Sequence, residues 1–238
     1  SPQSNASHAH VGFYSSENPY RYSDTEPMFT ISYRDTKGLE NRWNYSSQDA
    51  KTAGTGHVNL FNGNLVFVSS GISTAGSILP VNVTQIYNSY QSRYDHTGTA
   101  LDAVHSADFS AMFMGKGFKL SLWESIVPVT IGGTSWYVYY DADGTELYFK
   151  QGTDGDYISE DGLALTLKVQ SDSAEAERYR LHDDYGNDKL FDASGYLREI
   201  RDSLGNRKKL VYTNSRITSV DYYPAGTTEA ITQLTLLY

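Results

Sequence analysis

The sequence has 238 residues, 39% hydrophobic and 20% charged, and its formal net charge of −9 argues against nucleic acid and anionic membrane surfaces as partners, because both repel an acidic protein. It contains no cysteine, which excludes disulfide bonds and thiolate metal sites. The 20 tyrosines and 20 glycines suit half-buried strands joined by tight turns, so we expect an all-β fold.

The first 60 residues divide into two parts. Residues 1–27 are polar and lack a sustained hydrophobic period, and we expect them to form a polar leader. Residues 28–60 are predicted to form a leader hairpin region that precedes the repeats. Apolar and polar residues alternate over residues 29–33, residues 35–38 supply turn chemistry, and residues 39–45 carry the returning apolar side chains.

Residues 61–238 are predicted to form a β-repeat region made of consecutive antiparallel hairpins. Asn62 and Gly63 separate two short apolar runs, which predicts a hairpin closed by a type I′ turn. At most one short helix is expected, between residues 98 and 114, where the hydrophobic period is helical and glycines limit the length. From Lys116 onward, apolar runs and glycine turns alternate, as in a succession of strands.

A motif of Asp, two variable residues, Gly and an apolar residue five positions later occurs four times. Asp can bond its own backbone to start a turn, Gly takes the positive φ, and the following residues extend as a strand that ends at a buried side chain. One such unit cannot bury its face alone, so the units are expected to stack into a continuous, curved or spiralling sheet. The motif positions are Asp141, Gly144 and Phe149; Asp183, Gly186 and Phe191; Asp192, Gly195 and Ile200; and Asp202, Gly205 and Leu210.

Four longer blocks accompany the repeats, namely residues 31–59, "FNGNLVF" (61–67), "LPVNVTQIYNSY" (79–90) and "GKGFKLSL" (115–122). In this order the last three resemble the opening of the repeat region in the Rhs/YD-repeat family, which comprises secreted bacterial proteins of wall-associated and polymorphic-toxin type, and residues 31–59 resemble the leader ahead of that region in Firmicute members. The resemblance covers residues 28–238. The family usually has Trp where this sequence has Phe118, and the Asp-Pro-x-Gly core segment that carries self-cleavage does not occur, so self-cleavage is not assigned.

The resemblance implies part of a β shell that wraps a carboxy-terminal toxin or effector domain. We therefore expect a non-catalytic structural section of a secreted or cell-surface bacterial protein. Its expected partners are downstream repeats of the same polypeptide and the carboxy-terminal cargo domain, since "LTLLY" (234–238) resembles a strand that needs a neighbour. Apolar runs such as Leu65 to Val68 are far too short to span a bilayer, and no membrane insertion is expected.

The sequence predicts no enzyme, no cofactor and no metal site. It contains no Gly-x-Ser-x-Gly elbow, His-Glu-x-x-His pair, phosphate-binding loop or dinucleotide fingerprint. Two carboxylates across a cleft would suffice to hydrolyse a sugar, which a motif search leaves open. The turns "DADG" (141–144) and "DGD" (154–156) offer oxygen ligands for calcium, but the glutamate of a full calcium loop is missing, which favours a turn role.

The alternative function is an extracellular carbohydrate-binding or adhesion module. Its best candidates are Trp136, Tyr137, Tyr139 and Asp141, because aromatic rings with a flanking carboxylate can bind a glycan. Strand alternation places Tyr137 and Tyr139 on one face and Trp136 and Tyr140 on the other. Cross-strand aromatic pairs also stabilise a two-sided sheet, and this structural role is favoured.

Overall fold

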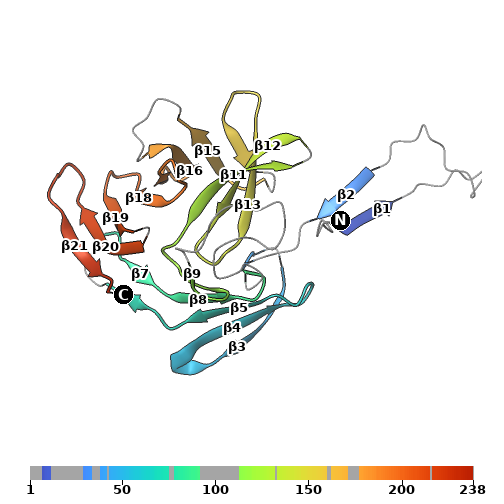
Figure 1. Ribbon diagram of the computed structural model, residues 1–238, viewed down its shortest axis with the longest axis horizontal. Helices are drawn as coiled ribbons and strands as arrows, with labels where there is room; N and C mark the ends of the chain where they lie inside the picture. Colours follow the sequence, from blue (N-terminus) through green and yellow to red (C-terminus); the bar gives the residue numbers. More distant parts are fainter. Residues whose placement is uncertain are drawn as a thin grey trace, which may run out of the picture.

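The computed structural model describes residues 7–11, 29–33, 38–41, 43–74, 78–91, 113–131, 133–159, 162–170, 177–214 and 216–237. This part of the chain is nearly all β, as the sequence predicts, and its strands are antiparallel (Figure 1). The 3₁₀ turn η1 (Lys51–Ala53) lies between β3 (Tyr45–Asp49) and β4 (Gly54–Asn59). None of the described residues belongs to a helix of the length and hydropathy needed to cross a membrane.

Two of the sheets have two strands each, and a third has six. The small sheets pair β1 (Ser7–Val11) with β2 (Phe29–Tyr33) and β6 (Ile72–Ser73) with β7 (Asn82–Val83). The six-stranded sheet has the order β3-β4-β5-β8-β10-β9, with β3 at Tyr45–Asp49, β4 at Gly54–Asn59, β5 at Leu65–Ser69, β8 at Gln85–Asn88, β9 at Phe113–Gly115 and β10 at Phe118–Leu120.

The fourth sheet has eleven strands in strict sequence order, so every connection is a hairpin. Its strands are β11 (Ser125–Ile131), β12 (Thr134–Tyr140), β13 (Glu146–Gln151), β14 (Tyr157–Ser159), β15 (Leu165–Val169), β16 (Tyr179–Asp183), β17 (Asp188–Phe191), β18 (Leu197–Arg201), β19 (Arg207–Thr213), β20 (Arg216–Tyr223) and β21 (Ile231–Thr235). The sheet curls above the six-stranded sheet in Figure 1. A single bridge joins Ser125 to Tyr196, and the sheet does not close into a barrel.

One hydrophobic core joins the two large sheets. It includes Leu120 of the six-stranded sheet, Val81 just before β7, and Ile126, Phe149 and Phe191 of the eleven-stranded sheet. A polar contact crosses the same boundary, because the Asn88 amide donates to the carbonyl of Asp143 at 3.2 Å. The two sheets therefore pack as layers of one body.

Two details of the sequence-based prediction are wrong. The strand over residues 29–33 pairs with Ser7–Val11 and not with residues 39–45, because Tyr33 lies opposite Ser7 and Tyr45 belongs to β3. The turn at Asn62 and Gly63 is not type I′, because only Gly63 has a positive φ (73°) and the loop is longer than two residues. The hairpin itself, β4 with β5, is confirmed. Of the segment predicted to hold a short helix, residues 98–112 lie outside the described residues, and Phe113 and Met114 are in β9.

Candidate functional site

The four Asp-x-x-Gly motifs form four turns with the same backbone geometry. In each, the Gly amide donates to the carbonyl of the Asp three residues earlier, and the Asp amide donates to the carbonyl of the residue after Gly. The four glycines have φ between 82° and 91°, a region that an L side chain rarely adopts. These turns connect β12 to β13, β16 to β17, β17 to β18 and β18 to β19.

The Asp side chains stabilise the turns by accepting backbone hydrogen bonds. Asp202 Oδ1 accepts from the amides of Leu204 at 3.0 Å and Asn206 at 2.8 Å, and Asp183 Oδ1 accepts equivalent bonds at 2.9 and 2.8 Å. Burial pushes the pKa of Asp183 and Asp202 upward, but these hydrogen bonds outweigh it and hold each pKa below its ordinary value. The turn role assigned from the sequence therefore agrees with the geometry.

Turns that neighbour one another on one edge of the sheet are coupled by asparagines that the sequence analysis did not single out. Asn206 Nδ2 donates to Asp202 Oδ2 at 2.8 Å, while its Oδ1 accepts from the amide of Ala225 in the next turn at 3.0 Å and from the Tyr222 hydroxyl at 3.1 Å. Asn187 makes the matching bond to Asp183 at 2.9 Å and accepts from the amide of Ser203 at 3.3 Å. The signal was visible in the sequence, since Asn follows Gly in both turns.

The apolar position of the motif supplies core anchors. Phe149, Phe191 and Leu210 are buried in the main core, while Ile200 is partly buried and packs against it. The register explains this outcome, because Phe149 lies opposite Tyr137 and Phe191 opposite Tyr179 on the same side of the sheet. We call this side, which carries Ile126, Leu167 and Leu181, the inner face.

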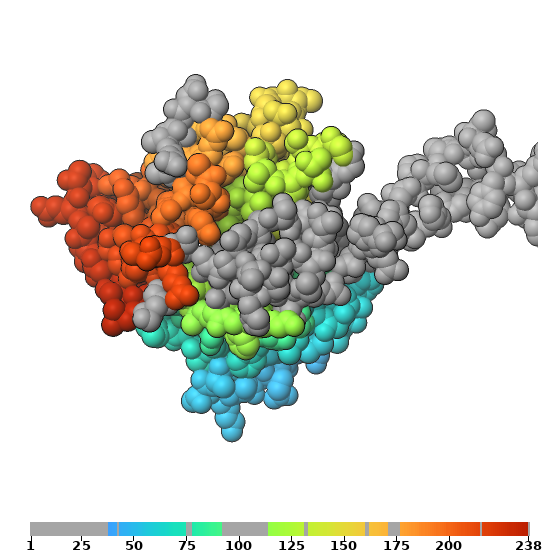
Figure 2. Space-filling view, in the orientation of Figure 1, coloured from blue at the N-terminus to red at the C-terminus, as the bar shows by residue number. Residues whose placement is uncertain are grey.

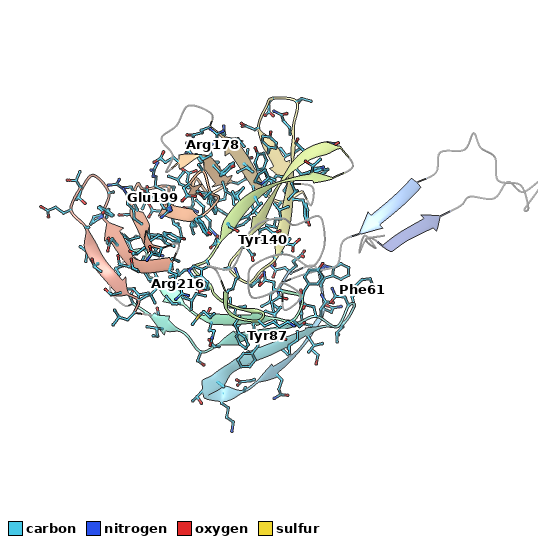
Figure 3. All side chains as sticks on the ribbon, viewed as in Figure 1. Phe61, Tyr87, Tyr140, Arg178, Glu199 and Arg216 are labelled. Atoms are coloured by element: carbon cyan, nitrogen blue, oxygen red, sulfur yellow. The ribbon has the colours of Figure 1, made fainter. Side chains whose placement is uncertain are left out.

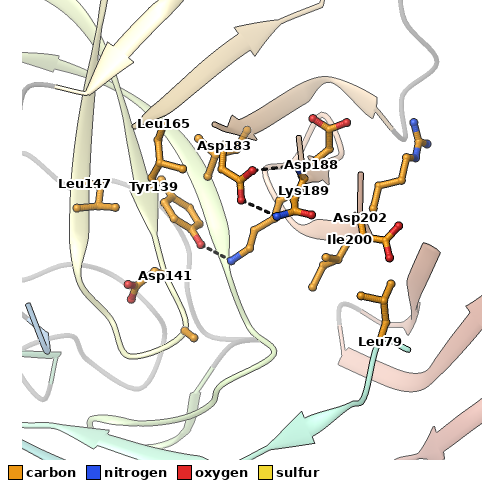
Figure 4. Close-up of a pocket in the computed structure, with 14 residues that line it drawn as sticks. Leu79, Tyr139, Asp141, Leu147, Leu165, Asp183, Asp188, Lys189, Ile200 and Asp202 are labelled. Atoms are coloured by element: carbon orange, nitrogen blue, oxygen red, sulfur yellow. Dashed lines mark hydrogen bonds between the residues drawn. The ribbon is translucent and has the colours of Figure 1, made fainter. Parts of the chain in front are cut away.

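The inner face borders a cavity of about 560 Å³ (Figure 4). Its apolar lining comes from Leu147, Leu165, Leu181 and Ile200 of the eleven-stranded sheet and from Leu79 at the opposite side. The polar lining includes Tyr139, Asp141, Lys189 and Asp202. A mainly apolar hollow with a few converging polar groups is the usual form of a binding site.

A buried polar cluster stands beside the cavity. The Tyr139 hydroxyl donates to Glu124 Oε2, and Lys189 Nζ lies 2.6 Å from the same carboxylate oxygen and 2.8 Å from the Tyr139 hydroxyl. Burial, together with the Glu124 carboxylate, raises the pKa of Tyr139 well above its usual range. Tyr139 is therefore a neutral hydrogen-bond donor. The cluster joins the segment before β11 to β12 and β17 by hydrogen bonds, which is a structural role.

Lys119 of β10 is only 2% exposed and reaches across to the eleven-stranded sheet. Its Nζ donates to the carbonyl of Trp123 at 2.8 Å and to the carbonyl of Asp141. Burial lowers the pKa of Lys119, whereas burial and the neighbouring Asp143 carboxylate raise the pKa of Asp141 well above its ordinary value. The shifted pKa values of Lys119 and Asp141 therefore arise at a contact between the six-stranded and the eleven-stranded sheet.

The predicted glycan candidates do not form one flat, exposed surface. Tyr139 and Tyr140 are buried, and Tyr137 packs edge-on against Tyr157, with ring centroids 4.8 Å apart. Trp136 lies on the opposite side of the strand, under Lys150 Nζ at 5.6 Å. Asp141 contributes its Oδ1 to the backbone of its own turn. A glycan at these residues stays a prediction, and their packing is that of sheet anchors.

The other face of β15–β19 carries a ladder of charges, which we call the outer face. Asp188 is buried there and accepts from Arg180 Nε at 2.9 Å and Nη2 at 2.7 Å, while His182 Nδ1 lies 2.7 Å from Asp188 Oδ1. Glu199 Oε1 accepts from Arg201 Nε at 2.7 Å on the same face. Burial opposes ionisation of Asp188, but Arg180 and His182 outweigh it and hold its pKa below the ordinary value.

The described side chains include no group of three or more potential metal ligands. The chain matches no known protein-family model and no curated protein.

Proposed function

We propose that this chain is a non-catalytic structural section of a β shell of the Rhs/YD-repeat type. In this proposal the inner face and its cavity contribute to a compartment for a carboxy-terminal toxin or effector domain of the same polypeptide. The parent protein would be secreted or displayed on a bacterial surface.

The observation that carries the proposal is that the four Asp-x-x-Gly turns share one backbone geometry. A wall built from repeats needs one turn that can be reused, and each Asp-x-x-Gly turn here closes with the same pair of backbone hydrogen bonds. The asparagine bonds from Asn187 and Asn206 fix two of these turns against the neighbouring turn on the same edge of the sheet.

The chemistry of the two faces also fits a wall. The inner face is mainly apolar around the cavity, whereas the outer face of β15–β19 carries ion pairs such as Arg180 with Asp188. A solvated outer side and an apolar inner side suit a shell that encloses a polypeptide.

The proposed partner for the open side of the eleven-stranded sheet is a further repeat. In the described residues β21 pairs only with β20, and Ile231 in β21 is exposed. An unpaired strand edge is a template for another strand, so further hairpins can add to β21 without any rearrangement of the ladder.

The test uses the same edge. If β21 is a pairing edge, sedimentation velocity of the isolated chain at rising concentration should show self-association, and hydrogen exchange in β21 should slow as it does. Ile231→Lys combined with Thr235→Lys should abolish both effects, because lysines on an edge strand oppose pairing. Val211→Lys is the control, since Val211 is also exposed but belongs to the interior strand β19.

A chain that stays monomeric at every concentration would contradict the open edge. So would association that persists in the double lysine variant.

A further inference from the structure

The six-stranded sheet has two faces of different character. One face packs toward the eleven-stranded sheet and buries Val66, Ile86 and Lys119. The opposite face carries Phe67 of β5, Tyr87 of β8 and Phe118 of β10, because Phe67 lies directly opposite Tyr87, and Tyr87 directly opposite Phe118. We call these three rings the aromatic row. Its strands lie at the lower side of the molecule in Figure 2, and Figure 3 labels Tyr87 there.

The aromatic row is accessible, unlike the rings near the cavity. Phe118 is 38% exposed, and Phe67 and Tyr87 are half-buried. The centroids of the Tyr87 and Phe118 rings are 4.8 Å apart, and the planes are tilted by 46°. The row therefore consists of the contacting rings of Tyr87 and Phe118, with Phe67 at the register position opposite Tyr87 on the adjacent strand.

This face carries no charged side chain in the six described strands. The charged residues of these strands are Asp49 and Lys119, and each belongs to the opposite face, because each follows directly after a residue of this one, Gln48 and Phe118 respectively. The polar groups beside the aromatic row are uncharged amides and hydroxyls, namely those of Ser46, Gln48, Ser69 and Gln85. In a protein with a net charge of −9, a neutral face selects for a neutral partner.

Gly56 gives a position without a side chain beside the row, which we call the ledge. Gly56 of β4 lies opposite Phe67 on one side and opposite Gln48 on the other. A Cβ at Gly56 would approach Phe67 Cδ2 at 3.5 Å and Leu65 Cδ1 at 3.7 Å, which are ordinary contact distances. The fold thus tolerates a side chain at this position, and its absence leaves room beside the rings.

We propose that the aromatic row binds a neutral oligosaccharide. The C–H bonds of a sugar ring carry partial positive charge and stack on the negative faces of aromatic rings. The amides of Gln48 and Gln85 and the hydroxyls of Ser46 and Ser69 are placed to bond the sugar hydroxyls at the border. The ledge at Gly56 receives the next sugar unit along the row.

An acidic polymer does not fit this face, because no described cation lies on it to offset the negative charge of the protein. The remaining competitor is a second copy of the chain, packed through the same apolar surface. The experiment separates the two occupants.

A glycan array with neutral and acidic oligosaccharides, followed by calorimetric titration with cellohexaose and chitohexaose, tests the site. We expect binding of neutral glycans only. Tyr87→Ala and Phe118→Ala should each weaken it by roughly tenfold, the effect of losing one ring contact. Gly56→Val should weaken it as much by filling the ledge while the melting temperature is kept. Tyr185→Ala is the matched control, since Tyr185 is 84% exposed in the β16–β17 turn, away from the row.

The proposal is overturned if no neutral glycan binds, if acidic glycans bind equally well, or if Gly56→Val binds like the unchanged protein. It is also overturned if sedimentation shows a dimer that Tyr87→Ala dissociates, because the occupant is then a second copy. Glycan binding without self-association through β21 would support this site and contradict only the open edge of the shell.

Discussion

The carbonyl oxygen of Gly195 accepts a hydrogen bond from the amide of Ile126 at 2.9 Å, which ties the turn between β17 and β18 to the first strand of the eleven-stranded sheet. The amide of Leu197 adds a second bond, to the carbonyl of Glu124 at 3.2 Å. A Cβ at Gly195 would stand 2.0 Å from the carbonyl oxygen of Ile126, the residue whose amide makes the first bond. Glycine at 195 is therefore needed twice, for its φ of 86° and for the approach of another backbone.

Gly195→Ala is expected to lower the free energy of unfolding by about 3 kcal/mol or more, since left-handed strain and a displaced backbone contact add together. Urea unfolding followed by tyrosine and tryptophan fluorescence measures the change. The control is Gly155→Ala, where φ is 93° and nothing lies within 4 Å of the added Cβ. This variant should lose only the strain, about 1–2 kcal/mol. Equal losses in the two variants would show that the Ile126 contact contributes nothing.

Asn206→Ala is expected to destabilise the chain more than Asn187→Ala. Asn206 is 4% exposed and bonds the Tyr222 hydroxyl, Ala225 and Asp202, so its removal leaves buried polar groups unpaired and should cost about 2–3 kcal/mol. Asn187 is less buried and its bond to the next turn is longer, at 3.3 Å, so about 1 kcal/mol is expected. Chemical denaturation of both variants measures the order. The reverse order would contradict the proposed coupling between turns.

The turns could be predicted from the sequence because their chemistry is local. Asp and Gly three residues apart contain nearly all the information for the turn, and the structure gives Gly144, Gly186, Gly195 and Gly205 the expected positive φ. The pairing of residues 29–33 could not be predicted in the same way. It depends on competition between distant strands, and the winning partner, "SHAHV" over residues 7–11, has only a weak apolar alternation.

The aromatic row was missed for a related reason. Phe67, Tyr87 and Phe118 are far apart in sequence and meet only through the registers of three strands. Local density pointed instead to the segment around Trp136 and Tyr139, where packing against neighbouring strands buries two of the four rings. Whether a ring is exposed depends on how the sheets pack against one another, and a single sequence does not show that packing.

The turn aspartates should make the chain sensitive to acid. Because hydrogen bonds hold the pKa of Asp183 and Asp202 below the ordinary value despite burial, their contribution is present at neutral pH and is lost as the pH falls through the folded-state pKa. Asp202→Asn should therefore flatten the loss of stability below about pH 4. Urea unfolding at a series of acidic pH values measures the slope. An unchanged slope would contradict the role of Asp202.

Asp141→Asn should act in the opposite direction. Burial and the Asp143 carboxylate raise the pKa of Asp141, so its ionisation opposes folding and the unchanged protein should gain stability as the pH falls toward the ordinary value of an aspartate. The variant lacks this gain. The same series of unfolding measurements checks it, and a gain that survives in Asp141→Asn would assign the effect to another group.

On the alkaline side, Lys119 should produce a rise of stability with pH. Burial lowers its pKa in the folded chain, so between that value and the ordinary lysine pKa the unfolded chain binds more protons, and stability increases as the pH rises. Lys208 adds to the rise, because burial lowers its pKa too. Above about pH 10 the trend should reverse, since the raised pKa of Tyr139 keeps this phenol protonated only in the folded chain.

Lys119→Met should reduce the rise of stability with pH. It should also lower stability at neutral pH by about 3 kcal/mol, because the carbonyls of Trp123 and Asp141 lose their donor. Lys168→Met, at an exposed lysine paired with Asp156, is the control and should change neither quantity by more than about 1 kcal/mol. If Lys119→Met keeps the full alkaline rise, the lysine that joins the two sheets is not its source.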